Sequence, residues 1–252
     1  TGGEPLVRKG LTDFIARLRG LEGLQDISLT TNGTLIPRFG RRLRQAGLNR
    51  INISLDTLDA LKFKRMTGAD QFTSVWEGIQ LAAELGFAPI KINTVVMKGF
   101  NDDEIEALAA LSMTYPFHMR FIEYMPIGVD PHAAAEDYIP MAQIRERLER
   151  MGRLTAVASQ KLDGPAVRFR FEGAPGEIGL IGSMSDHFCS SCNRMRLTAA
   201  GSLRPCLLAD DEVNVIAPMR AGASDRQLAD VFRQALALKS GRHQLRFDGG
   251  RA

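Results

Sequence analysis

The sequence has few of the features that would place it outside the ordinary globular proteins. Only three of its 252 residues are cysteine, and aromatic residues make up 7%. An odd number of cysteines argues against a framework of disulfides. The apolar runs are far shorter than the roughly 20 residues that span a bilayer. The chain also opens without the basic and apolar segments of a signal peptide. We therefore expect a cytoplasmic protein with reduced thiols and no membrane partner.

A strong charge excess is also missing. Lysine and arginine total 32 and aspartate and glutamate total 29, which gives a net charge of +3. A dedicated nucleic-acid binder usually shows a large basic excess, so no nucleic-acid partner is expected. The balance still allows a local basic pocket for an anionic small molecule. With 44% apolar residues, the chain can bury a sizeable core, as one large domain or two modest ones.

Two hydrophobic periods alternate along the first half of the chain. Short β-branched runs predict four strands, at 27–31, 51–55, 90–96 and 119–124. Apolar residues at helical spacing predict helices between them, at 11–18, 35–46, 72–83 and 101–111. We expect Gly86 to close the third helix and Asn101 to cap the start of the fourth. This alternation indicates parallel βαβ units.

Polar residues follow each of these expected strands. Open sheets and barrels of βαβ units both place their sites at the carboxyl ends of the strands. Any one polar residue there can simply cap a turn, but the set as a whole predicts a shared pocket. The set is Thr30, Thr31, Asn32, Ser54, Asp56, Asn93 and Glu123.

The pattern changes near residue 126. A loop is expected to residue 140, followed by a helix over 144–151 that ends at Gly152. Runs over 166–171 and 177–181 are spaced like antiparallel strands. A final helix is predicted over 225–238.

The three cysteines form the pattern C-x₂-C-x₁₃-C, at Cys189, Cys192 and Cys206. Thiolates at this spacing favour a soft or borderline metal. A zinc ion would need a fourth ligand, for which His187 is the nearest candidate. A [4Fe–4S] cluster would accept three thiolates and leave one iron open. The remaining alternative is three buried free cysteines, which are common in cores.

A short basic segment follows directly, with Arg194, Met195 and Arg196. In an extended segment, the two arginines at alternate positions point to the same side. Guanidinium groups suit phosphate or purine acceptors because they offer a planar fork of donors. The alternative interpretation is a solvated basic turn.

Several segments together resemble a known family. They are Thr1-Gly2-Gly3-Glu4-Pro5, Thr30-Thr31-Asn32-Gly33, Asn52-Ile53-Ser54-Leu55-Asp56, Lys91-Ile92-Asn93-Thr94-Val95, 120–125, 176–181 and 188–196. In this order they are similar to the GTP 3′,8-cyclases of molybdenum cofactor biosynthesis, which are radical S-adenosylmethionine enzymes. The resemblance extends to about residue 240. The segment that joins C-x₂-C to N-R-x-R is its most specific part.

The resemblance implies the fold and the domains. The fold class is α/β, an incomplete (β/α)6 TIM-type barrel of the radical S-adenosylmethionine type. A C-terminal α+β segment carries an iron–sulfur site. The expected domains are a partial barrel over 1–126 and, over 127–252, a segment with the second [4Fe–4S] cluster and the GTP site.

The resemblance also implies the chemistry. In the family, a first [4Fe–4S] cluster cleaves S-adenosylmethionine reductively, and the resulting 5′-deoxyadenosyl radical takes hydrogen from the ribose of GTP. The product is a cyclic dihydroguanosine triphosphate. An electron donor is a further implied partner, and a homodimer is a candidate assembly because the family is often dimeric.

Individual roles follow from the aligned motifs. The residues implied in binding S-adenosylmethionine are Gly3, Ser54 and Met125. Those implied in binding GTP are Thr30, Lys91, Arg194, Met195 and Arg196. Those implied in holding the second [4Fe–4S] cluster, which binds guanine at its open iron, are Cys189, Cys192 and Cys206.

The sequence departs from the family in one important respect. It lacks the C-x₃-C-x₂-C motif that holds the first cluster. We therefore expect the chain to be an N-terminally truncated piece without the first strand–helix unit, inactive by itself, with the first cluster present only in a full-length protein. Two alternatives remain: a zinc-stapled (β/α) barrel lyase with a Schiff base on Lys91, and an inactive nucleotide-binding fragment.

Overall fold

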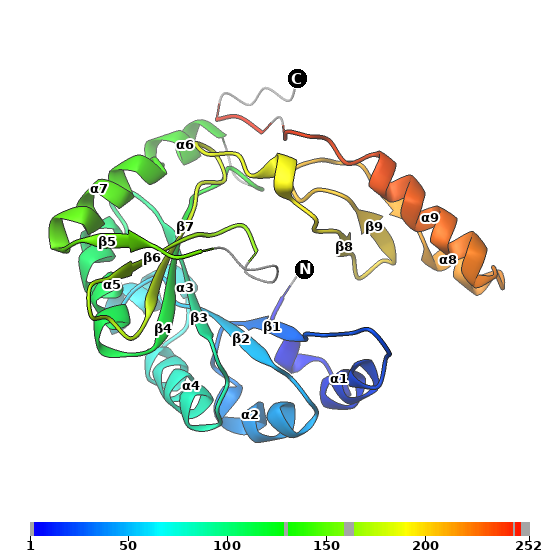
Figure 1. Cartoon of the computed structure of the whole chain (residues 1–252), viewed down its shortest axis with the longest axis horizontal. Coiled ribbons are helices and arrows are strands. Elements are labelled where there is room, and N and C mark those ends of the chain that lie inside the picture. The colour runs from blue at the N-terminus through cyan, green and yellow to red at the C-terminus, as the bar shows by residue number, and fades with distance from the viewer. Residues whose placement is uncertain (1–2, 129–130, 159–163, 244, 248–252) are drawn as a thin grey trace. The chain divides into compact units, whose positions relative to one another are not determined.

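The structure is a computed structural model that describes residues 3–128, 131–158, 164–243 and 245–247 (Figure 1). Its contacts divide the chain into two compact units, which are described separately. The first, here called the sheet unit, consists of Glu4–Tyr124 and Asp137–Gly182. The second, called the cysteine unit, consists of Thr1–Gly3, Met125–Glu136 and Ser183–Ala252. The domain boundary that the resemblance implies, between residues 126 and 127, stays a prediction.

A seven-stranded sheet forms the centre of the sheet unit, in the order β1-β2-β3-β4-β7-β6-β5. The first four strands are parallel and confirm the expected βαβ alternation; they are β1 (Ser28–Thr31), β2 (Arg50–Ser54), β3 (Ile90–Val96) and β4 (Phe117–Glu123). β7 (Glu177–Ile181) pairs with β4 in parallel. β6 (Val167–Phe171) pairs with β7 in the expected antiparallel sense. β5 (Leu154–Ala156), where no strand was predicted, pairs antiparallel with β6 and completes the sheet.

Helices cover one face of this sheet. The helices of the sheet unit are α1 (Leu11–Arg19), α2 (Ile36–Gln45), α3 (Ala60–Thr67), α4 (Phe72–Glu84), α5 (Ile105–Thr114) and α7 (Met141–Met151). Figure 1 shows α2, α4, α5 and α7 on the same side of the strands. Alternate strand residues such as Ile53, Ile92 and Phe121 are fully buried in the core beneath them. Because successive side chains of a strand point to opposite faces, this apolar face is separated from a polar one.

The end of α4 confirms the role expected of Gly86. Its backbone has a φ of 72°, a left-handed conformation that glycine adopts without a steric penalty. The amide of Phe87 donates to the carbonyl of Ala82 at 3.1 Å, and the amide of Gly86 donates to Ala83 at 3.0 Å. These bonds satisfy carbonyls that the last turn of a helix leaves unpaired.

The start of α5 differs from the prediction. Asn101 makes no side-chain cap, and a 3₁₀ turn over Asp102–Glu104 precedes the helix. Asn101 is buried instead, and its Nδ2 donates to the carbonyls of Asp56 at 2.7 Å and Val95 at 2.9 Å. Its Oδ1, the atom that a helix cap would use, accepts from the Met97 amide at 2.8 Å.

The cysteine unit has a smaller framework. Its elements are α6 (Pro131–Glu136), a 3₁₀ turn at Cys189–Ser191, the strands β8 (Arg196–Leu197), β9 (Ser202–Arg204) and β10 (Val213–Asn214), and the helices α8 (Ile216–Arg220) and α9 (Asp225–Ala237). The three strands form an antiparallel sheet. Its core contains Leu203, Val213, Val215 and Ala235. α9 confirms the predicted final helix.

None of the helices in the described ranges combines the length and the apolar character that crossing a bilayer requires.

Candidate functional site

A row of polar side chains crosses the sheet on the face opposite the helices. The register places Thr30 beside Asn52, Asn52 beside Lys91, Lys91 beside His118, and His118 beside Glu177. Of these residues, the resemblance had implied Thr30 and Lys91 as GTP contacts. The sequence alone did not reveal that His118 and Glu177 continue the same row, because the pairing of β4 with β7 fixes their position.

Direct contacts and charges connect the members of this row. Asn52 Nδ2 donates to Thr30 Oγ1 at 3.3 Å. Lys91 is only 4% exposed, so the row contains a buried ammonium group. Burial, together with the charges of Lys91, Arg168 and Arg120, lowers the pKa of His118 to about 4, although Glu177 opposes the shift. His118 is therefore neutral near pH 7.

Two arginines hold the carboxylate of Glu177. Arg168 binds it through Nε at 2.8 Å and Nη2 at 3.0 Å, and Arg170 Nη2 lies 2.7 Å from it. Burial tends to raise the pKa of Glu177, but the hydrogen bonds from Arg168 and Arg170 and the charge of Arg168 bring it below its ordinary value. Glu177 therefore stays ionised and is paired with two guanidinium groups.

A second row lies one step nearer the carboxyl ends of the strands. Its members are Ser54, Asn93, Arg120 and Gly179, in register. Asn93 Oδ1 is buried and lacks a hydrogen-bond partner among the described residues. A side chain at Gly179 would place its Cβ 3.1 Å from Arg120 Cγ, so glycine leaves room for the arginine. Asn93 is thus a polar group available to a ligand, in line with the expected pocket.

Other polar residues of the expected pocket have structural contacts. Glu123 is fully buried, and its Oε1 accepts bonds from Tyr138 Oη at 3.1 Å and from the Met141 amide, at the start of α7, at 2.6 Å. Asp56 Oδ1 accepts from the Val95 amide at 2.8 Å. Burial raises the pKa of Asp56, and that bond opposes the rise. The contacts of Glu123 and Asp56 therefore match the alternative interpretation, in which a polar residue after a strand simply caps a turn or a helix.

Glu4 of the G-G-E-P motif binds the end of β1. Its carboxylate accepts from Thr31 Oγ1 at 2.6 Å, from the Asn32 amide at 2.7 Å and from the Leu6 amide at 3.1 Å. Thr31 and Asn32, expected in the pocket, thus help to anchor this segment. Gly3 and Met125 belong to the cysteine unit and Ser54 to the sheet unit, so their S-adenosylmethionine contacts stay a prediction.

The cysteines all lie in the cysteine unit and are all partly buried. Cys189 and Cys192 are joined by a tight turn, in which the Cys192 amide donates to the Cys189 carbonyl at 3.1 Å. Lys239 Nζ lies 3.6 Å from Cys192 Sγ and donates to the carbonyl of Pro205, next to Cys206, at 2.9 Å. Lys239 thus links the two parts of the motif.

Positive charge surrounds these thiols. Burial tends to raise the pKa of Cys192, but hydrogen bonds with Arg194 and the charges of Arg194 and Lys239 lower it overall. Burial and the charge of Arg194 lower the pKa of Arg196, while the nearby Cys206 and Cys192 oppose that shift. Both arginines therefore lie close enough to interact with Cys192. The environment of Cys192 therefore favours its thiolate, the form of cysteine that binds metals.

The remaining residue of the basic segment has an apolar role. Met195 is partly buried and packs against the core of the cysteine unit, which contains Leu203 and Val213. Arg194 places its guanidinium 4.9 Å from the centre of the Phe188 ring. The contribution of all three residues to GTP binding stays a prediction.

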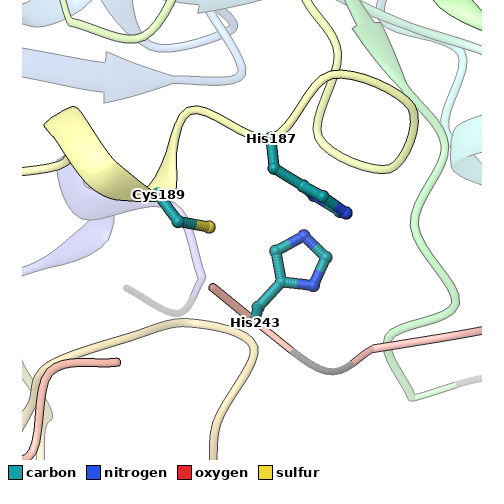
Figure 2. A group of neighbouring side chains, drawn as sticks. All are labelled: His187, Cys189 and His243. Atoms are coloured by element: carbon teal, nitrogen blue, oxygen red, sulfur yellow. The ribbon is translucent and has the colours of Figure 1, made fainter. Parts of the chain in front are cut away.

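The three cysteines do not form a compact site for one ion. In the described part of the chain, the potential metal ligands whose atoms all lie within 4.8 Å of one another are His187, Cys189 and His243 (Figure 2). A single tetrahedral zinc would hold two thiolates about 3.8 Å apart, given bonds of about 2.3 Å. A cluster of several irons spreads its ligands more widely, because each thiolate binds a different iron.

Comparisons with known proteins define the class to which the chain belongs. Residues 1–111 match the model of the radical SAM superfamily, and residues 117–245 match the model named Molybdenum Cofactor Synthesis C. The chain is thus a radical S-adenosylmethionine protein with a mixed α/β fold. One solved structure, "Structure of TYW1 with a lysine-pyruvate adduct bound", aligns with a TM-score of 0.44 and 18% identity, over 64% of this chain and 51% of that chain.

Curated relatives give the particular family. The chain is 46% identical over 246 residues to the "GTP 3',8-cyclase" of Pelotomaculum thermopropionicum, covering 97% of this chain and 76% of the relative. It is 46% identical over 245 residues to the protein of the same name from Moorella thermoacetica, with the same coverage. The chain belongs to the GTP 3′,8-cyclase family.

Proposed function

We propose that this chain serves the GTP 3′,8-cyclase reaction of molybdenum cofactor biosynthesis, which converts GTP into a cyclic dihydroguanosine triphosphate. The extent of the match carries this proposal: 46% identity over 97% of the chain. The substrates are GTP and S-adenosylmethionine. We propose that β1–β4 and their helices are part of an incomplete (β/α) barrel, which presents polar residues at the carboxyl ends of its strands.

We propose that Cys189, Cys192 and Cys206 hold a [4Fe–4S] cluster. Their partial burial, the tight turn between the first two and the positive charge of Lys239 support this donor set. When bound, such a cluster offers one iron without a thiolate, to which guanine can bind. The protein's own contribution is to favour the thiolate of Cys192 and to shield the site with the surrounding chain.

Arg194 and Arg196 are proposed to hold the oxygen atoms of GTP. Both interact with Cys192, so both guanidinium groups are close to the proposed cluster. A guanidinium binds carbonyl or phosphate oxygens through a planar fork, whereas a lysine supplies a single point charge. Met195 is proposed to contact GTP between them.

In the sheet unit, Thr30 and Lys91 are proposed to contact GTP as well. Their neighbouring positions in the polar row and the buried charge of Lys91 support this role. A buried ammonium is favourable only with compensating interactions, which an anionic substrate can strengthen. Gly3, Ser54 and Met125 are proposed to bind S-adenosylmethionine.

Replacement of the two arginines tests this assignment. We expect Arg194→Lys and Arg196→Lys each to weaken GTP binding by the cluster-loaded protein about ten- to a hundredfold. The reason is the loss of charge-assisted hydrogen bonds, each worth about 1.5–3 kcal/mol. The measurement is the equilibrium affinity for GTP, with ATP as the specificity control and with iron content and absorbance checked in every variant.

Arg226→Lys is the matched control, because Arg226 is an exposed residue of α9 in the same unit. It should leave GTP affinity unchanged. Unchanged affinity in both Arg194→Ala and Arg196→Ala, with the cluster intact, would return the segment to the solvated-turn interpretation. Equal affinity for GTP and ATP in the parent protein would contradict the proposed substrate.

A further inference from the structure

A second set of metal-binding side chains overlaps the cysteine motif. His187 and Cys189 are two positions apart, and His243 reaches them from the segment after α9. One ligand atom from each lies within 4.8 Å of the others. Figure 2 shows the Cys189 thiol directed toward the neighbouring imidazole rings. The chain thus gathers two imidazoles and one thiol at one place within the cysteine unit.

The hydrogen bond of His243 fixes which of its nitrogens is available. Its Nε2 lies 2.8 Å from the carbonyl oxygen of Ser183. A carbonyl can only accept, so Nε2 carries the hydrogen and Nδ1 carries the lone pair. Nδ1 is buried and has no hydrogen-bond partner among the described residues. In a histidine that binds a metal through Nδ1, Nε2 usually donates to a carbonyl in this way. Figure 2 shows Nε2 nearer than Nδ1 to the His187 ring, so the His243 ring has to turn for Nδ1 to bind the ion.

His187 has a similar unsatisfied group. Its Nδ1 is also buried and without a hydrogen-bond partner in the described part of the chain. The ring stands at 90° to that of His243, with the ring centres 4.3 Å apart. Two unpartnered nitrogens in buried positions carry an energetic cost that a bound cation would remove. His187 and His243 therefore form an aromatic contact and also offer two buried nitrogens that a cation can bind.

We propose that His187, Cys189 and His243 bind a single zinc-type divalent cation when the chain carries no iron–sulfur cluster. Two imidazoles and a thiolate suit borderline metals, and hard cations such as magnesium prefer oxygen. Three protein ligands leave the fourth tetrahedral position for water or another small ligand. The site is distinct from the three-thiolate set because two of its three ligands are histidines.

The two metal sites share Cys189. When the Cys189 thiolate is bound to the zinc-type ion, it cannot also bind an iron of the cluster. The ion and the complete cluster therefore exclude one another. Zinc bound at this site would therefore delay cluster assembly. This competition rests on the proposed function, whereas the histidine–cysteine site itself does not.

The experiment uses the whole chain, reduced and freed of metal under anaerobic conditions. Zinc is added in competition with a chromophoric chelator, and cobalt(II) is added separately because its thiolate complexes absorb in the near ultraviolet. We expect one zinc ion per chain and a thiolate-to-cobalt band. His187→Ala, His243→Ala and Cys189→Ser should each weaken zinc binding by more than about 100-fold, since loss of an outer-shell partner alone costs 10–100-fold.

Matched controls separate this site from other ligand sets. Cys192→Ser and Cys206→Ser should keep the zinc affinity of the parent, since neither residue belongs to the proposed set. His118→Gln, a change in the sheet unit, should do the same. Far-ultraviolet circular dichroism checks that each variant is folded.

Two results would overturn the proposal. One is zinc that persists in both histidine variants and is lost in Cys192→Ser, which would assign the ion to the thiolates. The other is the absence of stoichiometric zinc in the parent chain. The proposed function is tested independently: iron incorporation into His243→Ala should proceed normally if the three cysteines hold the cluster. If His243→Ala does not incorporate iron while zinc binding behaves as expected, the result counts against the cluster assignment and not against the zinc site.

Discussion

The two units of this chain position their chemical groups by different means. In the sheet unit, Thr30, Asn52 and Lys91 project from neighbouring parallel strands, and the register sets their spacing. In the cysteine unit, the thiols lie on a 3₁₀ turn and in loops around a small core. A large helix-covered sheet can therefore carry a buried charge such as Lys91, whereas the loops offer side chains suited to a metal.

The comparison indicates where metal binding should matter most. All three cysteines belong to the cysteine unit, and the sheet unit contains none. A cluster or ion would add cross-links to the unit whose apolar core is the smaller one. The predictions below test this contrast, starting with the largest effect.

The chain of 252 residues should not cleave S-adenosylmethionine. Reductive cleavage requires a cluster held by three thiolates, and all three available thiolates are proposed for the cluster that binds GTP. Incubation of the iron-loaded chain with dithionite and S-adenosylmethionine should give no 5′-deoxyadenosine above a protein-free blank. Clear formation of 5′-deoxyadenosine would mean that the cysteines are assigned to the wrong cluster.

Glu104→Gln should destabilise the sheet unit in a pH-dependent manner. Glu104 accepts bonds from Thr57 Oγ1 at 2.7 Å and the Leu58 amide at 2.6 Å, and it pairs with Lys62 at 2.6 Å. Burial alone would raise the pKa of Glu104, but these partners lower it from the ordinary 4.5. At pH 7, we expect a loss of about 1.5–3 kcal/mol in the free energy of unfolding.

The pH dependence follows from the direction of that shift. A pKa lowered by folding gives stability that is complete above the unfolded value near 4.5 and disappears as pH falls through the folded value. The difference between parent and variant should therefore shrink below pH 4.5. Urea unfolding followed by the fluorescence of the single tryptophan, Trp76 in α4, measures it. Glu149→Gln, which breaks an exposed pair with Arg145, should cost no more than about 0.5 kcal/mol. Equal losses for both variants would contradict the prediction.

Ser224→Ala should have a smaller effect, confined to the cysteine unit. Ser224 caps α9 by accepting from the Gln227 amide, and the Gln227 side chain accepts from the Ser224 amide at 2.8 Å. Loss of the cap should cost about 1 kcal/mol, and Ser224→Gly should cost only a few tenths. Hydrogen exchange should therefore accelerate in α9 and not in β3. Acceleration in both elements would show that the two units unfold together.

Much of the fold could be predicted from the sequence because local periodicity expresses it directly. Short β-branched runs identified β2 and β3, and helical spacing identified α2 and α4. The position of Gly86 at the end of α4 was also predictable, since glycine adopts positive φ at little cost. α3 was not foreseen, because its apolar pattern is short.

The sequence by itself also determined the spacing of the three cysteines and the basic residues that follow Cys192, since ligand spacing and charge are local properties. Tertiary structure alone decided which residues meet across long separations. The row from Thr30 to Glu177 required the pairing of β4 with β7. The partnership of His243 with Ser183 joins residues 60 positions apart, and no local pattern encodes such a return. Similarly, Asn101 does not cap a helix because its Oδ1 accepts from the Met97 amide, while its Nδ2 donates to the carbonyls of Asp56 and Val95.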